Sequence, residues 1–179
     1  MEGKIKSLYH FLSSKFQTVH FEYKYNPCPR YGHGKPAHPL LYEIIARQRT
    51  HYEELLNDFL AYSHNIQSIK PATDKARETE EPVWNNEFLP GLDIIGIYGM
   101  LSHYKPKQYI EIGSGNSTKV ARKAINEQNL KTEIISIDPY PRTDIDVISD
   151  KVIRQPFEDL EDNQFITDSL QENDILFID

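Results

Sequence analysis

The stretch Lys107-Gln-Tyr-Ile-Glu-Ile-Gly-Ser-Gly-Asn-Ser-Thr118 decides the fold class of this chain. Its first six residues are rich in β-forming side chains and predict a strand. Gly113 and Gly115 then predict a tight turn, because glycine adopts turn conformations without steric cost. The helix-forming segment 119–128 follows directly. A strand, a glycine turn and a helix in this order indicate the start of a βαβ unit.

The same alternation of strands and helices continues on both sides of this stretch. A helix is predicted before it, over residues 87–104, and another after it, over residues 165–171. Apolar runs predict three further strands, at residues 132–138, 151–154 and 174–179. Strands that alternate with helices form parallel sheets. We therefore expect an α/β fold with a Rossmann-like, mostly parallel sheet over residues 83–179.

An aromatic-rich N-terminal arm, residues 1–69, precedes this sheet and carries a different pattern. From Pro39 to Ile66, apolar and aromatic side chains recur at steps of three and four, which predicts one long amphipathic helix. We expect this helix to cover the chain's own core; the alternative is pairing with its twin in a homodimer. A short strand is predicted at residues 20–25, and the polar, proline-bounded segment 70–82 is predicted to be a linker.

Composition excludes several classes of protein. The chain has 179 residues, of which 39% are hydrophobic and 26% are charged, as in globular domains. The formal net charge of -7 argues against nucleic acid or an anionic membrane as a partner. No apolar run approaches the roughly 20 residues that a membrane-spanning helix needs. Because one cysteine, Cys28, cannot form an internal disulfide, we expect a cytoplasmic location.

A metal site in the arm is considered and not predicted. Cys28, His33 and His38 are evenly spaced, but structural zinc usually takes four ligands and a C-x-x-C pair. We expect instead that this turn-rich segment folds over a binding cleft, or is a plain surface loop.

Ligands of open parallel sheets bind at the carboxyl ends of the strands. There, the helix that follows Gly115 offers N–H groups beside the hydroxyls of Ser117 and Thr118, an arrangement that favours an anion. Asp138 ends the next strand, where a carboxylate can accept both hydroxyls of a ribose. Together these features predict a nucleoside-containing cofactor. NAD is disfavoured, because its G-x-G-x-x-G fingerprint requires glycine where this chain has Thr118.

Three motifs resemble the class I S-adenosylmethionine-dependent methyltransferases: Glu111-x-Gly113-x-Gly115, Ile137-Asp138-Pro139 and the run Asp174–Asp179. The resemblance covers roughly residues 83–179, and the string from Tyr109 to Thr118 looks like a small-molecule or glycan-associated subgroup. It implies S-adenosylmethionine as the cofactor and a sheet with strand order 3-2-1-4-5-7-6. Because this chain stops after the fourth strand, we expect it to be part of a longer polypeptide.

The resemblance also implies residue roles. The acid at Glu111 helps to hold the amino end of the cofactor's methionine, directly or through water, and Asp138 accepts the ribose hydroxyls. Asp179 faces the methyl group and the acceptor and is the candidate base, with His103 as the alternative. The implied cofactor-binding set is Glu111, Gly113, Ser114, Gly115, Asn116, Ser117, Asp138, Pro139, Phe157 and Glu158, the last two beside adenine; no metal is implied.

Two functions of different class follow. The first is methyl transfer from S-adenosylmethionine to a small-molecule or glycan acceptor, with a hydroxyl as the favoured acceptor group. The second is a non-catalytic module that keeps the nucleotide pocket and acts through partner binding by its arm. A nicotinamide-dependent oxidoreductase is a distant third.

Overall fold

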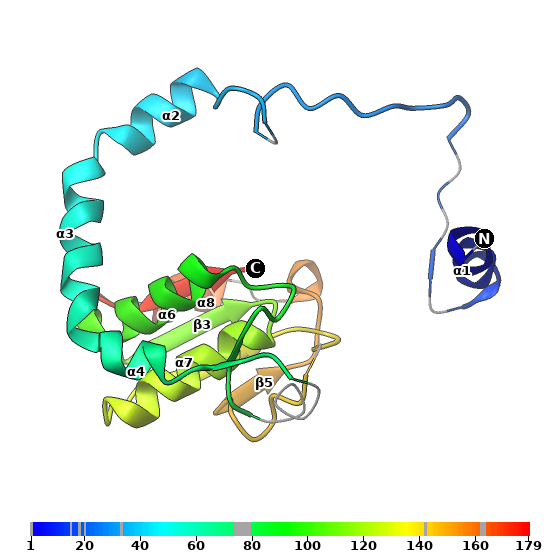
Figure 1. Cartoon of the computed structure of the whole chain (residues 1–179). Coiled ribbons are helices and arrows are strands. Elements are labelled where there is room, and N and C mark those ends of the chain that lie inside the picture. The colour runs from blue at the N-terminus through cyan, green and yellow to red at the C-terminus, as the bar shows by residue number, and fades with distance from the viewer. Residues whose placement is uncertain are drawn as a thin grey trace. The chain divides into compact units, whose positions relative to one another are not determined.

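The computed structural model describes the chain except for Met1, Lys15, Thr18, His20, His33, residues 74–79, Arg142 and residues 162–163. The chain divides into two compact units, Met1–Gln48 and Arg49–Asp179 (Figure 1). From the sequence, the boundary between the arm and the sheet domain was predicted at the polar segment 70–82. The boundary between the two compact units lies instead between Gln48 and Arg49.

The described residues of the first unit form two helices, α1 (Glu2–Leu12) and α2 (Pro39–Ala46). Helix α1 was not predicted from the sequence. Pro39 begins α2, where its missing N–H costs nothing, and the Nδ1 atom of His38 accepts a hydrogen bond from the Leu41 N–H. Residues 21–25 form no strand, so that prediction is wrong over these residues, while His20 lies outside the described residues.

The helix predicted over residues 39–66 is interrupted, so the prediction of one continuous helix is wrong. The segment forms α2, then α3 (Arg49–Phe59), the 3₁₀ turn η1 (Leu60–Tyr62) and α4 (Ser63–Gln67). Only Phe59 and Ile66 of the predicted apolar stripe are buried. The tighter 3₁₀ turn between them changes the helical phase, and the Tyr62 hydroxyl there donates to the carbonyl of Ser102.

A four-stranded parallel sheet forms the centre of the second unit. Its spatial order is β5 (Lys151–Ile153), β4 (Glu133–Ile137), β3 (Gln108–Ile112) and β6 (Ile175–Ile178). In register, Ile110 of β3 lies beside Ile135 of β4 and Leu176 of β6. The α/β class, the four strands and their parallel direction are confirmed.

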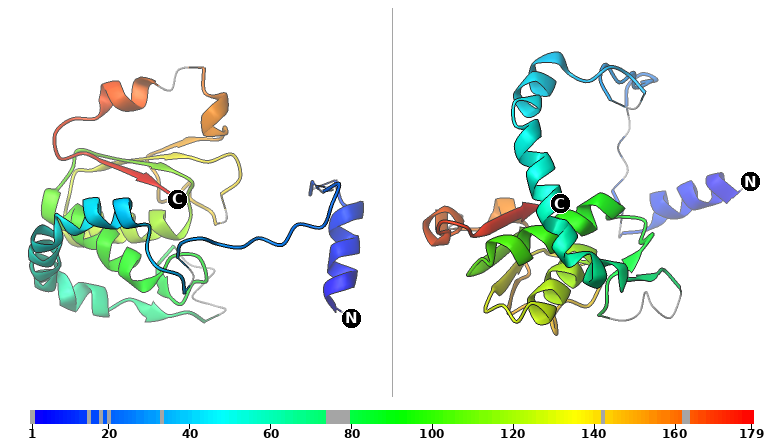
Figure 2. Two further views of the ribbon diagram at one scale, coloured as in Figure 1. Left: turned by 90° about the horizontal axis from the view of Figure 1, so that it is seen from above. Right: turned by 60° about the vertical axis from the view of Figure 1, so that its left-hand side comes forward.

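Helices cover both faces of this sheet (Figure 2). Helices α6 (Gly91–Tyr104) and α7 (Asn116–Glu127) pack on one face, where Ile94, Leu101 and Val120 are fully buried. Helix α8 (Gln164–Ser169) and the 3₁₀ turn η2 (Phe157–Asp159) lie on the other, over the buried side chains of Ile110, Ile135 and Ile137.

Two short paired strands lie at the start of the segment predicted to be a linker and directly after its end. Strand β1 (Lys70–Pro71) pairs in parallel with β2 (Val83–Trp84). This pairing brings the chain entering α6 close to the end of α4. Within the described ranges, no helix combines the length and the apolar character that a bilayer crossing requires.

Candidate functional site

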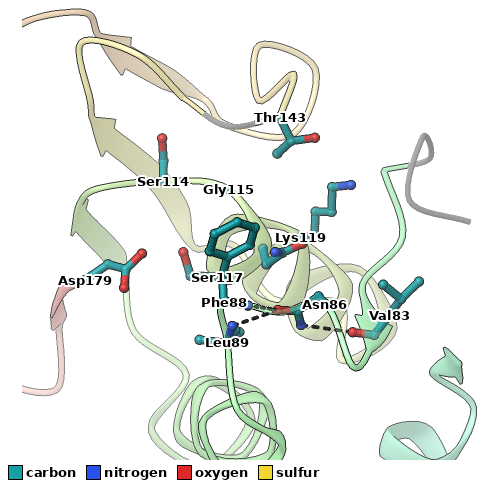
Figure 3. Close-up of a pocket in the computed structure, with 11 residues that line it drawn as sticks. Val83, Asn86, Phe88, Leu89, Ser114, Gly115, Ser117, Lys119, Thr143 and Asp179 are labelled. Atoms are coloured by element: carbon teal, nitrogen blue, oxygen red, sulfur yellow. Dashed lines mark hydrogen bonds between the residues drawn. The ribbon is translucent and has the colours of Figure 1, made fainter. Parts of the chain in front are cut away.

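A pocket of about 160 Å³ opens at the carboxyl ends of β3 and β6 (Figure 3). Four segments form it: the turn after β3 with the start of α7, the approach to α6, the loop after β4 and the residue after β6. Its lining residues are Val83, Asn86, Phe88, Leu89, Ser114, Gly115, Asn116, Ser117, Lys119, Thr143 and Asp179.

The turn after β3 brings the backbone into the pocket. Gly113 has φ +82° and Gly115 has φ 149°, both values that disfavour any side chain. A Cβ atom at Gly113 would lie 3.2 Å from the Cβ atom of Asp179. The first turn of α7 then presents Asn116 and Ser117 to the pocket. Backbone N–H groups at such a helix start have no intrahelical partner and favour a negatively charged ligand.

Glu111 lies beneath this turn rather than in the pocket wall. Its side chain is fully buried, on the face of β3 that α7 covers. Its carboxylate accepts hydrogen bonds from the hydroxyls of Thr118 (2.5 Å), Ser136 (2.5 Å) and Ser117 (3.1 Å). Burial raises the pKa of Glu111 to about 7, although the three hydroxyls oppose this shift. Glu111 therefore fixes the start of α7 against β3 and β4.

Asp138 fixes the other side of the same turn. Its Oδ2 atom accepts hydrogen bonds from the N–H (2.8 Å) and the hydroxyl (3.0 Å) of Ser114. Its Oδ1 atom accepts one from the N–H of Tyr140 (2.8 Å). Asp138 and the adjacent Pro139 are half-buried. Neither lines the pocket directly, but Asp138 is bonded to Ser114, which does.

The structure does not bring the two residues expected at adenine into this pocket. Phe157 packs against the core cluster that contains Ile110 and Ile166, and Glu158 is exposed on η2. Both are absent from the pocket lining. The resemblance implied that both residues lie beside adenine, but the sequence could not show that the Phe157 ring would pack on the sheet.

The two candidate bases differ in their position. Asp179 follows β6, is exposed and lines the pocket. His103 lies near the end of α6, where its Nδ1 atom is 3.6 Å from a carboxylate oxygen of Asp58. His103 is not among the residues that line the pocket, so the geometry favours Asp179.

Sequence reasoning missed several lining residues, notably Asn86, Lys119 and Thr143. The buried Asn86 side chain accepts hydrogen bonds from the N–H groups of Phe88 and Leu89 and donates to the carbonyl of Val83. The Asn85-Asn86 pair is a turn signal that could have indicated this segment. Nothing local in the sequence assigns Thr143 to the pocket.

No group of three or more His, Cys, Asp and Glu side chains suited to a metal occurs among the described residues. Cys28 is exposed. His33, the middle residue of the three evenly spaced candidates, lies outside the described part of the chain.

No protein-family model and no solved structure matches this chain. It is similar to a protein of Archaeoglobus fulgidus that is described as uncharacterized, with 34% identity over 96 residues. The match covers 50% of this chain and 42% of that protein, so the chain spans less than half the length of this relative.

Proposed function

We propose that this chain binds S-adenosylmethionine and forms all or part of a methyltransferase that acts on a hydroxyl of a small molecule or glycan. The observation that carries the proposal is the pocket at the strand ends, built on the turn from Gly113 to Ser117. Glu111 and Asp138 hold this turn from beneath and from the side. The order β5-β4-β3-β6 also agrees with the first four strands of the fold that the resemblance implies.

The chemistry of the pocket is compatible with this cofactor. Its amino-acid portion carries a carboxylate, and to this group the pocket offers Lys119 together with the N–H groups at the start of α7. Asp138 lies one hydrogen bond away from the pocket lining, through Ser114, and its Oδ1 atom accepts a hydrogen bond from the N–H of Tyr140. A ribose would compete with the Ser114 hydroxyl for this carboxylate.

The cofactor supplies an electrophilic methyl group whose leaving thioether is neutral. The protein therefore needs mainly to position the acceptor and exclude water. A hydroxyl acceptor loses its proton as the new C–O bond forms, and under this proposal the carboxylate of Asp179, which lines the pocket, receives that proton.

The second candidate function, partner binding by the arm, is favoured by one observation. Large apolar side chains of the arm are exposed, among them Phe21, Tyr23 and Tyr25. Under this hypothesis, changes in the pocket would have no effect on function.

A calorimetric titration with S-adenosylhomocysteine tests the proposal. We expect saturable binding by the wild-type protein, no binding of NAD, and loss of binding in Asp138→Ala. Asp146→Ala is the matched control, because this exposed acid pairs with Arg154 outside the pocket. Folded wild-type protein that does not bind S-adenosylhomocysteine would contradict the proposal, as would equal binding by both variants and the wild type. Thermal melts establish that each variant is folded.

A further inference from the structure

Lys119 is a cation in an unusual position. It lies in the first turn of α7, near the helix end where the dipole and the free N–H groups already favour negative charge. The residue is only 3% exposed, and it lines the pocket. Burial lowers its pKa, and the negative charge of Glu80 partly opposes this shift. A buried cation beside a helix start adds to the positive potential that the helix end already gives to the pocket.

The charges of the pocket are separated. Figure 3 shows Asp179 on one side and Lys119 on the other, with Ser117 and Phe88 between them. The Lys119 side chain extends toward Thr143, and the Asp179 carboxylate lies beside the turn after β3. Because Lys119 lies apart from Asp179, the residue proposed as the base, it can contact a different part of the ligand, and its charge favours an anionic group there.

We propose that Lys119 binds the carboxylate of the cofactor's amino-acid portion and is the residue that selects for this group. This inference rests on the proposed function and adds to it a residue that the motifs did not indicate. Asn116 and Ser117, whose N–H groups begin α7, also line the pocket and favour the same negative charge. A purely structural role, an ion pair with the exposed Glu80, is the competing explanation.

The test compares two ligands that differ only in the carboxylate, S-adenosylmethionine and decarboxylated S-adenosylmethionine, by calorimetric titration. We expect the wild-type protein to prefer S-adenosylmethionine by about 10- to 100-fold, as is typical of a hydrogen bond between charged groups. Lys119→Met should abolish this preference by weakening S-adenosylmethionine binding without weakening decarboxylated ligand binding. Lys119→Arg should retain part of the preference, and Glu80→Gln should leave it intact.

The outcomes separate this inference from the proposed function. If Lys119→Met weakens both ligands equally, Lys119 acts through the fold and the inference is wrong. The inference is also wrong if the variant keeps the wild-type preference, or if the wild-type protein binds both ligands equally, while the proposed function then stands. If the folded wild-type protein binds neither ligand, the proposed function itself fails.

Discussion

Glu111 is buried beneath the pocket and is hydrogen-bonded to residues at the start of α7. It alternates with Ile110 and Ile112 along β3, so its side chain lies on the face that α6 and α7 cover. Three hydroxyl donors compensate part of the cost of burying its carboxyl group. The resemblance assigned Glu111 to the cofactor's amino end; the structure places it where it orders the residues that line the pocket.

The raised pKa of Glu111 predicts a specific pH dependence of stability. Its pKa rises from 4.5 to about 7 in the folded protein, so the folded state retains this proton over a range in which the unfolded state has lost it. The free energy of unfolding should therefore decrease as the pH rises through this range, by about 3 kcal/mol from this group. Urea unfolding at pH 4.5 and pH 8 measures the change.

Glu111→Gln should lack this component, so its stability should decrease less between the two pH values. Glu133→Gln, which removes an exposed carboxylate from the neighbouring strand, should retain the wild-type change. A Glu111→Gln protein with the same pH dependence as the wild type would show that Glu111 titrates normally in the fold.

At the scale of elements, the sequence predicted the sheet well and the arm poorly. The strands of residues 108–178 are short apolar runs bounded by turn signals, and the central strands β3 and β4 are buried on both faces, which favours a strand over other conformations. The arm has a clear apolar period, but periodicity does not show whether a neighbouring element covers the stripe. The structure leaves Leu41 and Ile45 exposed and interrupts the helix at Arg47–Gln48.

The site was predicted only in part, because local sequence locates strand ends but does not show which distant segments pack beside them. The glycine turn and Asp179 follow directly from strand ends, which local sequence locates. The wall formed by Asn86 and Thr143 comes from segments distant in sequence, and only tertiary packing places them at the pocket. The same packing places Phe157 on the core instead of at the pocket.

The contact between α3 and α6 depends on a glycine. A Cβ atom at Gly99 would lie 2.4–2.6 Å from three ring atoms of the buried Phe59. We expect Gly99→Ala to lower the free energy of unfolding by about 1–3 kcal/mol, because α3 must move away from α6. Gly96→Ala in the same helix meets no atom within 4 Å, so it should be neutral or stabilise the protein by up to about 1 kcal/mol. Urea unfolding of both variants tests this; equal stabilities would contradict it.

At the scale of the whole molecule, apolar surface stays exposed in both units. In the second unit, α3, α6 and β6 line a groove of about 490 Å³, whose residues include Leu56, Leu92 and Ile97. Among the described residues β6 pairs only with β3, and its Ile178 is 67% exposed. In the first unit, α2 buries none of its residues. Exposed apolar surface of this extent is typical of proteins that associate.

The exposed apolar face of α2 predicts that the chain forms a homodimer through its arm. Its four aliphatic side chains, Leu40, Leu41, Ile44 and Ile45, are each more than half exposed and lie on one helical face. Burying this face against a second copy would remove it from water, so sedimentation velocity should show a concentration-dependent dimer. Leu41→Glu with Ile45→Glu should give a monomer, because both charges would be buried in the interface. The control is the double variant Thr50→Glu with Asn57→Glu, which adds the same charge at exposed polar positions of α3 and should leave the dimer intact. A wild-type protein that is monomeric at every concentration would exclude this mode of association. Equal dissociation of both double variants would exclude it as well.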